Sequence, residues 1–267
     1  SDVYKRQDCE FGPDCNFYWS DWVSGWNPQG KGRIFKLTDS EAQKNPAVKE
    51  AKELIAGGMS QKTPEELIQY LQHPHQHVRQ EAQYELADEK RLPKVMKSLL
   101  ATYLAKPNQQ LISRLHAVWA LGQIYRKSGD DPLFLASLLK DPDPVIRGIA
   151  ALTLAESTKG SGYHHEAILK MLTDPEPRVQ TQAAFALHRL SKSMSFPNES
   201  HGRIMTFADK ATDPHLRHAA VVLLSSYDKS VVGQIPFAPG NLSANQKIVL
   251  ALALRRIGDV NAEERLV

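Results

Sequence analysis

The stretch DPDPVIRGIAALTLAES, residues 141–157, decides the fold because it holds a helix start followed by a periodic apolar run. An Asp side chain accepts bonds from the free N–H groups at a helix start, and Pro tolerates the first helical position. We therefore expect a helix to begin at Asp141-Pro142. Asp174-Pro175 and Asp213-Pro214 offer the same combination and predict two further helix starts.

The apolar positions after these starts follow the period of a helix. In three segments, apolar residues stand at positions i, i+4 and i+8, and the central residue of each triplet is Ala. The triplets are Val78, Ala82 and Leu86; Ile146, Ala150 and Leu154; and Val179, Ala183 and Leu187. Each triplet forms one stripe on a helix, and its central Ala lets a second helix approach closely. One helix pair cannot bury such a stripe alone, whereas stacked pairs can.

A proline break divides the chain into similar units. The breaks contain Pro74, Pro107, Pro142, Pro175 and Pro214, at intervals of 33 to 39 residues. Each unit carries a helical stretch, a short break and a second helical stretch. This period predicts a mainly α fold, an α-solenoid of about five to six repeats.

The units resemble HEAT repeats over about residues 60–258, on their Asp-Pro-x-x-Val-Arg pattern with Ala and Leu downstream. In that family the Arg commonly bonds with the Asp of a neighbouring repeat. The resemblance implies that Arg147 bonds with Asp141 or Asp174 in a structural ladder. The remaining ladder residues would be Arg79, Asp213 and Arg217. The alternative is that the arginines form a basic stripe for an acidic partner.

Three units depart from the ladder pattern. Gln180 replaces the Arg in the fourth unit, Arg114 is shifted from the expected position in the second, and the fifth unit is two residues shorter before Leu216-Arg217. Elsewhere, Asn45-Pro46 and Gly57-Gly58 bracket a connector helix at about 46–56. Thr63 and Glu66 have the spacing of a capping box. A last helix is expected at about 243–257.

The start of the chain predicts β-structure instead. EFGPDCNFYWSDW, residues 10–22, reads as a Gly-Pro-Asp turn followed by an aromatic strand, and GKGRIFKL, residues 30–37, as a glycine-flanked strand. Together they resemble the last blade of a β-propeller, in which Gly stands at the place of Cys15. That turn position often needs a positive φ, so Cys15 is expected to strain it by about 1 kcal/mol unless the turn type differs.

A propeller blade that continues into HEAT repeats is similar to the membrane-bound dehydrogenases of planctomycetes and verrucomicrobia, whose propellers resemble glucose/sorbosone dehydrogenases. The resemblance implies that this chain is the end of the propeller plus the HEAT section, before any haem domain. The parent would be exported to the periplasm and use a quinone and c-type haem. The partners would be other proteins or the parent's propeller and cytochrome domains.

A propeller active site needs loops from several blades, so we expect this chain to have no catalytic residues and no oxidase activity. The remnants of such a site would be Asp21, Trp22, Trp26, Lys31 and Arg33. Each of these residues has a structural role as its alternative. Asp21 would stabilise a turn, the tryptophans would pack in the blade core, and Lys31 and Arg33 would lie on a solvated hairpin. Trp19 belongs with the tryptophans that could stack on a sugar ring.

Composition limits the remaining functions. The chain has 267 residues with a net charge of +3, which is too even to argue for nucleic acid, and its apolar runs are too short to cross a membrane. Cys9 and Cys15 have a spacing unsuited to zinc, and a disulfide across the turn stays open. His73, His75 and His77 lie around one turn without an evident set of further ligands. We therefore expect no metal and no cofactor in this chain.

The expected organisation has three parts. Residues 8–38 form the blade fragment, 39–62 a helical connector, and 63–258 the solenoid. The function expected is that of a structural and protein-binding section of an exported dehydrogenase-like redox protein. The alternative is a free-standing cytosolic HEAT scaffold whose β segment is a small cap.

Overall fold

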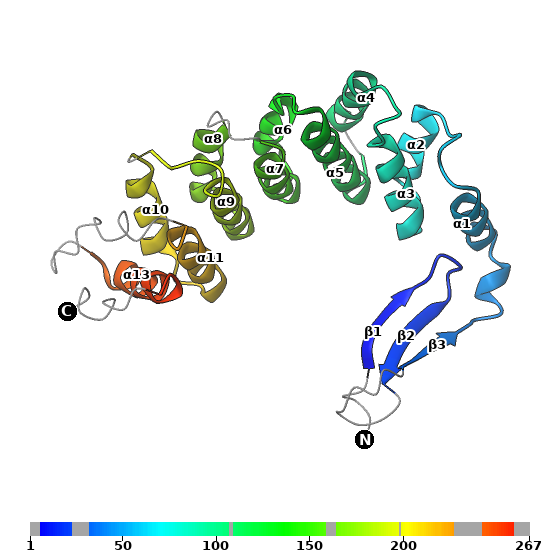
Figure 1. Ribbon diagram of the computed structural model, residues 1–267, viewed down its shortest axis with the longest axis horizontal. Coiled ribbons are helices and arrows are strands. Elements are labelled where there is room, and N and C mark those ends of the chain that lie inside the picture. The colour runs from blue at the N-terminus through cyan, green and yellow to red at the C-terminus, as the bar shows by residue number, and fades with distance from the viewer. Residues whose placement is uncertain are drawn as a thin grey trace. The chain divides into compact units, whose positions relative to one another are not determined.

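The computed structural model describes residues 6–22, 32–106, 109–158, 164–197, 199–226 and 242–258. Helices dominate, and a small antiparallel sheet stands at the N-terminal end, so the predicted fold class is confirmed (Figure 1). The chain divides into two compact units, residues 1–86 and 87–267. The first unit thus groups the sheet, the connector and the first two repeat helices.

The sheet has the order β1-β2-β3, with β1 (Arg6–Phe11), β2 (Phe17–Trp22) and β3 (Gly32–Leu37) antiparallel. In the β1–β2 turn the N–H of Cys15 donates to the Gly12 carbonyl at 2.9 Å. The φ angle of Cys15 is 59°, in the left-handed region. This confirms that the turn needs a positive φ at a position where the sequence places a side chain.

Asp14 anchors this turn. Its carboxylate accepts bonds from Asn16 Nδ2 at 2.6 Å, from the Tyr18 hydroxyl at 2.8 Å and from Lys36 Nζ at 2.7 Å. Burial opposes its ionisation, but these donors hold the pKa of Asp14 well below its usual range. The turn is therefore tied to both β2 and β3 by one charged group.

The sheet is thinly covered by the described residues. Phe17, Trp19 and Phe35 share one face, and the Trp19 and Phe35 rings stack with centroids 5.1 Å apart. No described side chain of the three strands is fully buried. Ile34 is 77% exposed, on the edge strand β3. Apolar side chains of the sheet, Phe11, Ile34 and Leu37 among them, are therefore exposed as far as the described residues show.

The first unit continues with helices that start where the sequence predicts. After the 3-10 turn η1 (Ala42–Lys44), α1 (Pro46–Gly57) is capped by Asn45 and followed by Gly58 at φ 70°. The helix α2 (Pro64–Tyr70) has the predicted capping box of Thr63 and Glu66. The helix α3 (Gln76–Leu86) completes the first helix pair.

The second unit is a row of helix pairs in two layers (Figure 1). The first helices are α4 (Pro93–Ala105), α6 (Leu133–Ser137) with η2 (Leu138–Lys140), α8 (His165–Lys170) with η4 (Met171–Thr173), and α10 (Glu199–Lys210). The second helices are α5 (Leu111–Ser128), α7 (Pro144–Ser157), α9 (Pro177–Leu190) and α11 (Pro214–Leu224), and α13 (Ala244–Arg256) follows. Among the described helices, none is long and apolar enough to cross a membrane.

Two of the expected helix starts are wrong by two residues. The helix α7 begins at Pro144, where Asp143 accepts a bond from the Val145 N–H, and α9 begins at Pro177. The reason is that Asp141 and Asp174 end the preceding 3-10 turns, and their carboxylates accept the N–H groups of residues 143 and 176. The third start is confirmed, because Asp213 caps α11 at Pro214.

The predicted stripes form the core. All nine residues of the three triplets are fully buried, Ala150 among them. The second helices α5, α7, α9 and α11 pack side by side in sequence order. A Cβ atom at Gly122 on α5 would lie 2.2 Å from Thr153 Cγ2 on α7, so these helices approach too closely for a larger residue.

Candidate functional site

Arg147 joins two consecutive repeats. Its Nε and one terminal nitrogen donate to the two carboxylate oxygens of Asp174, both at 2.9 Å. The other terminal nitrogen donates to the backbone carbonyl of Asp141 at 2.9 Å. The side chains of Arg147 and Asp174 are only 14% and 10% exposed. One guanidinium therefore fixes its own turn and the turn of the next repeat.

The charges of this pair stabilise one another. Burial alone would raise the pKa of Asp174, but the bonds from Arg147 and from the Glu176 N–H lower it. The bond with Asp174 raises the pKa of Arg147. A carboxyl group with a depressed pKa in the folded state contributes stability above its unfolded pKa and loses it as pH falls.

Arg114 makes the equivalent contact one repeat earlier. Its guanidinium bonds with the Asp141 carboxylate, and both side chains are nearly buried. The sequence pattern placed Arg114 out of step because it counted from the proline. Counted from the helix start instead, Arg114, Arg147 and Arg217 are each the fourth residue of their helix.

The other ladder residues contact backbone carbonyls. A terminal nitrogen of Arg79 donates to the carbonyls of His73 and Pro74, both at 2.7 Å. Gln180 donates to the Asp174 carbonyl at 2.6 Å, so it keeps this part of the Arg role without the charge. Arg217 donates to the Thr212 carbonyl at 3.2 Å. The Asp213 carboxylate accepts the first N–H groups of its own helix, at 2.8 and 3.2 Å.

The expected propeller remnants are only partly described. Asp21 on β2 lies opposite Arg33 on β3, and the Asp21 Oδ1 is buried without a hydrogen-bond partner among the described residues. Arg33 lies over the Phe35 ring at 5.6 Å. Trp22 is paired through its backbone with Gly32. Trp26 and Lys31 lie outside the described residues.

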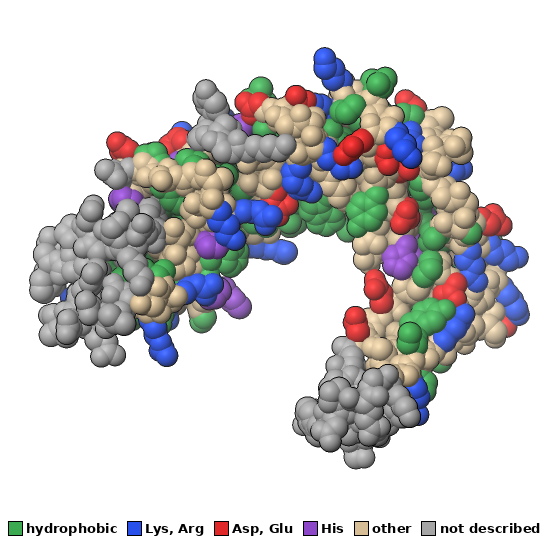
Figure 2. Space-filling model, in the orientation of Figure 1, with side chains coloured by type: hydrophobic (Ala, Val, Ile, Leu, Met, Phe, Trp, Pro, Cys, Tyr) green, Lys and Arg blue, Asp and Glu red, His purple; other side chains and the backbone are tan. Residues whose placement is uncertain are grey.

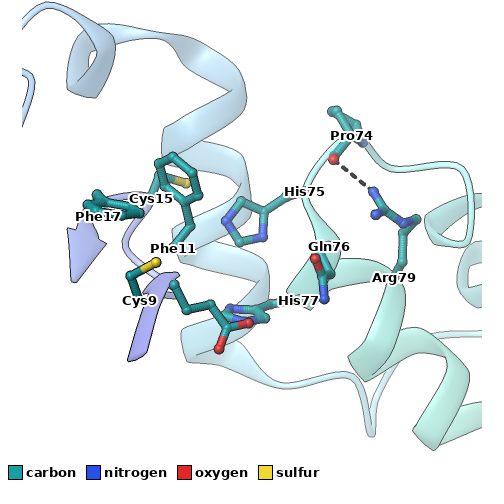
Figure 3. A pocket seen from close by; sticks show the side chains of 10 residues that line it. Cys9, Phe11, Cys15, Phe17, Pro74, His75, Gln76, His77 and Arg79 are labelled. Carbon is teal, nitrogen blue, oxygen red and sulfur yellow. Dashed lines mark hydrogen bonds and ion pairs between the residues drawn. The ribbon is translucent and has the colours of Figure 1, made fainter. Parts of the chain in front are cut away.

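A cavity of about 640 Å³ lies within the first unit, between the β1–β2 hairpin and the turn that leads into α3. Figure 3 shows Cys9 and Cys15 on the hairpin side and His75 and His77 on the other. The His77 Nε2 lies 3.7 Å from a carboxylate oxygen of Glu10. The cavity thus brings together both cysteines and two of the three histidines that the sequence singled out.

Burial favours the neutral forms of two groups that line this cavity, His75 and Cys15. Burial lowers the pKa of His75, with further contributions from His77, His73 and Arg79. Burial raises the pKa of Cys15, and both cysteines are free thiols. A protonated thiol is a poor nucleophile, so burial does not activate Cys15. Within the described ranges, no three His, Cys, Asp or Glu side chains converge on a point that could hold a metal ion.

The second-helix layer carries a stripe of large side chains that sequence reasoning missed. Trp119, Leu152 and Phe185 are each the ninth residue of their helix, on α5, α7 and α9, at intervals of 33 residues. His218, the fifth residue of α11, lies next to Phe185, and these four residues form the second-helix stripe. The first three are half-buried and His218 is exposed. The ring centroids of Phe185 and His218 are 6.3 Å apart. The 33-residue interval is the signal in the sequence that could have revealed this second-helix stripe. Its residues lie outside the buried apolar triplets from which the fold was predicted.

A groove of about 530 Å³ lies at the end of this layer, between α11 and the C-terminal half of α13. Its basic residues are Arg217, His218, Arg255 and Arg256, and its apolar residues are Pro214, Val221 and Leu252. Figure 2 shows Lys, Arg and His side chains gathered over α9 and α11. Of these residues, the sequence predicts a ladder role for Arg217 and a helix start at Pro214, and it does not indicate a groove.

Comparison with known proteins identifies the repeats. Models of HEAT repeats match residues 64–155 and 166–194. The chain therefore contains HEAT repeats, as the sequence pattern predicts. No curated protein matches the chain. A crystal structure described as an engineered protein, from the Northeast Structural Genomics Consortium, is 21% identical. It covers 73% of this chain and 96% of its own length, with a TM-score of 0.43.

Proposed function

We propose that this chain is a protein-binding scaffold section and that it does not catalyse a reaction by itself. The observation that carries the proposal is the second-helix stripe of Trp119, Leu152, Phe185 and His218. Large aromatic side chains that stay half-exposed on a rigid surface are typical anchors of protein interfaces. HEAT repeats commonly mediate protein interactions, which agrees with this role.

The finer proposal is that the scaffold belongs to an exported, dehydrogenase-like redox protein. Its support is the resemblance of the N-terminal strands to a propeller blade, together with the left-handed backbone at Cys15, where the blade pattern has Gly. The parent's quinone and c-type haem would lie in other domains. Asp21, whose buried Oδ1 has no hydrogen-bond partner among the described residues, is the remnant of a propeller site that we retain in this proposal.

The alternative is a free-standing cytosolic scaffold with a β cap. One observation favours it: the sheet is bonded to the connector within the first unit. The Gln43 side chain donates to the Asp14 carbonyl at 3.3 Å and to Asn16 Oδ1 at 3.2 Å. A cap that evolved for the solenoid would need such bonds, whereas a severed blade would not.

The reading frame upstream of residue 1 distinguishes these two. A signal peptide and further blades upstream support the exported parent, and an initiator Met directly before the sheet supports the cap. The purified 267-residue chain should also show no sugar oxidation with quinone or nicotinamide acceptors and no haem absorbance. Turnover that survives repurification would overturn the non-catalytic part of the proposal.

A further inference from the structure

The groove between α11 and α13 contains a ladder arginine, Arg217, that pairs with no carboxylate among the described residues. Arg217 is the fourth residue of its helix, as are Arg114 and Arg147, and each of those two binds an Asp side chain of the next turn. Arg217 makes no ion pair with a described residue. Its Nε is buried and has no hydrogen-bond partner there. The two ladder pairs show that a carboxylate fits a guanidinium at this place in a repeat.

The titratable residues that line the groove are all basic, and the carboxylate that directly precedes α11, Asp213, is engaged in capping that helix. Arg255 and Arg256 line the same groove, are exposed, and form no ion pair with a described residue. The helices α9, α11 and α13 contain Lys, Arg and His but no Asp or Glu. Closely spaced unpaired cations in a concave surface attract anionic groups.

The floor of the groove is apolar. Leu252 on α13 is 41% exposed, and Ile248, one turn earlier on the same face, is 45% exposed. Val221 on α11, which is nearly buried, lines the groove together with Leu252. An anion alone would leave this surface uncovered, so the groove suits a ligand that combines carboxylates with an apolar side chain.

We propose that the groove binds an extended acidic segment of a partner protein. One Asp or Glu of that segment pairs with Arg217 and further carboxylates with Arg255 and Arg256. An apolar side chain of the segment covers Val221 and Leu252. The inference rests on the proposed scaffold function and names the chemistry of the partner. It continues the second-helix stripe, because His218 belongs to both.

A peptide fits these observations better than a nucleic acid does. Affinity for nucleic acid comes from many phosphate contacts along a basic surface. The whole chain has a net charge of only +3, and the basic groups here surround exposed aliphatic side chains. The planar fork of Arg also matches a carboxylate in two bonds, as Arg147 demonstrates.

The test is fluorescence anisotropy on the full chain with a labelled dodecapeptide of Asp and Glu around a central Leu. A peptide with Asn and Gln in place of the acids is the ligand control. Removing a charge-assisted fork should weaken binding about tenfold or more. We expect that loss in Arg217→Gln and in the double variant Arg255→Gln/Arg256→Gln, and a smaller loss in Arg217→Lys, which keeps the charge without the fork.

Arg178→Gln is the matched control, because Arg178 is an exposed arginine on α9 outside the groove. It should bind the acidic peptide as the unchanged chain does. The double variant alters only exposed side chains, so it keeps the test decisive if Arg217→Gln fails to fold by circular dichroism.

Three results would overturn the inference: equal binding of the neutral peptide, equal loss in Arg178→Gln, or tighter binding of a single-stranded oligonucleotide than of the acidic peptide. A protein partner that binds the second-helix stripe but is indifferent to Arg255→Gln/Arg256→Gln would also overturn it. That last result would leave the proposed scaffold function intact, so the two failures are distinguishable.

Discussion

At the scale of single residues, the β1–β2 turn contains a side chain in a conformation that favours glycine. Cys15 has φ 59°, and a non-glycine residue in the left-handed region costs about 1 kcal/mol. Cys15→Gly should therefore raise the free energy of unfolding of the first unit by about 1 kcal/mol, measured by chemical denaturation. Cys15→Ala, which removes the thiol and keeps the Cβ atom, should give no such gain. A destabilised Cys15→Gly would show that the thiol contacts outweigh the backbone strain.

Replacing Arg147 should destabilise two consecutive repeats. Arg147→Ala removes a fork to Asp174 and a bond to a backbone carbonyl, and should lower the free energy of unfolding by about 1–3 kcal/mol. Because the folded-state pKa of Asp174 is lowered, this contribution is present at neutral pH and is lost as pH falls below about 4. Chemical denaturation at pH 7 and at pH 3 should show the variant and the unchanged chain converging in acid. An unchanged unfolding midpoint at pH 7 would rule out a structural ladder here.

At the scale of helices and strands, the buried triplets can be tested by volume. Ala150 is fully buried in α7, which packs against α5 and α9. Ala150→Leu should overpack this interface and cost about 1–3 kcal/mol in thermal unfolding. Ala47→Leu is the control, because Ala47 is an exposed residue of α1 and should change stability by less than about 0.5 kcal/mol. A neutral Ala150→Leu would mean that the helix faces another way.

For the sheet we expect association with other chains, because few described residues cover its apolar side chains. The exposed side chains of β3 and its unpaired edge among the described residues invite pairing with another chain. We expect the 267-residue chain to associate in light scattering and Ile34→Lys to reduce that association without loss of helicity. Leu92→Lys changes a similarly exposed residue of the second unit and should leave association unchanged. A monomeric unchanged chain whose strands resist proteolysis would favour the β cap.

The parts of these elements that the sequence predicts are those with local causes. The stripes, the capping box at Thr63 and the connector helix follow from periodicity and from bonds between residues a few positions apart. The starts of α7 and α9 depend on how the preceding 3-10 turns close, and that closure is not encoded in the Asp-Pro pair alone. Arg114 looked displaced because its place is defined by the start of its helix and not by the proline.

At the scale of the whole molecule, the candidate site was the harder part to predict. The candidate site residues that the sequence suggests are the propeller remnants and the histidines, which are residue types typical of catalytic and metal sites. The second-helix stripe and the α11–α13 groove consist of ordinary Trp, Leu, Phe, His and Arg side chains. Their meaning depends on stacking, which places residues 33 positions apart on one surface. Residues that share one surface of a repeat fold are therefore too far apart in the sequence to form a recognisable motif.

The central claim is that this solenoid binds a protein through its second-helix layer. The most direct measurement is photo-cross-linking in the source cells, with p-benzoylphenylalanine at Phe185 of the stripe or at Leu133. Leu133 is 66% exposed on α6, in the layer of first helices. We expect one discrete cross-linked protein from position 185 and none from position 133. Cross-links from position 133 alone, or equally from both positions, would contradict it.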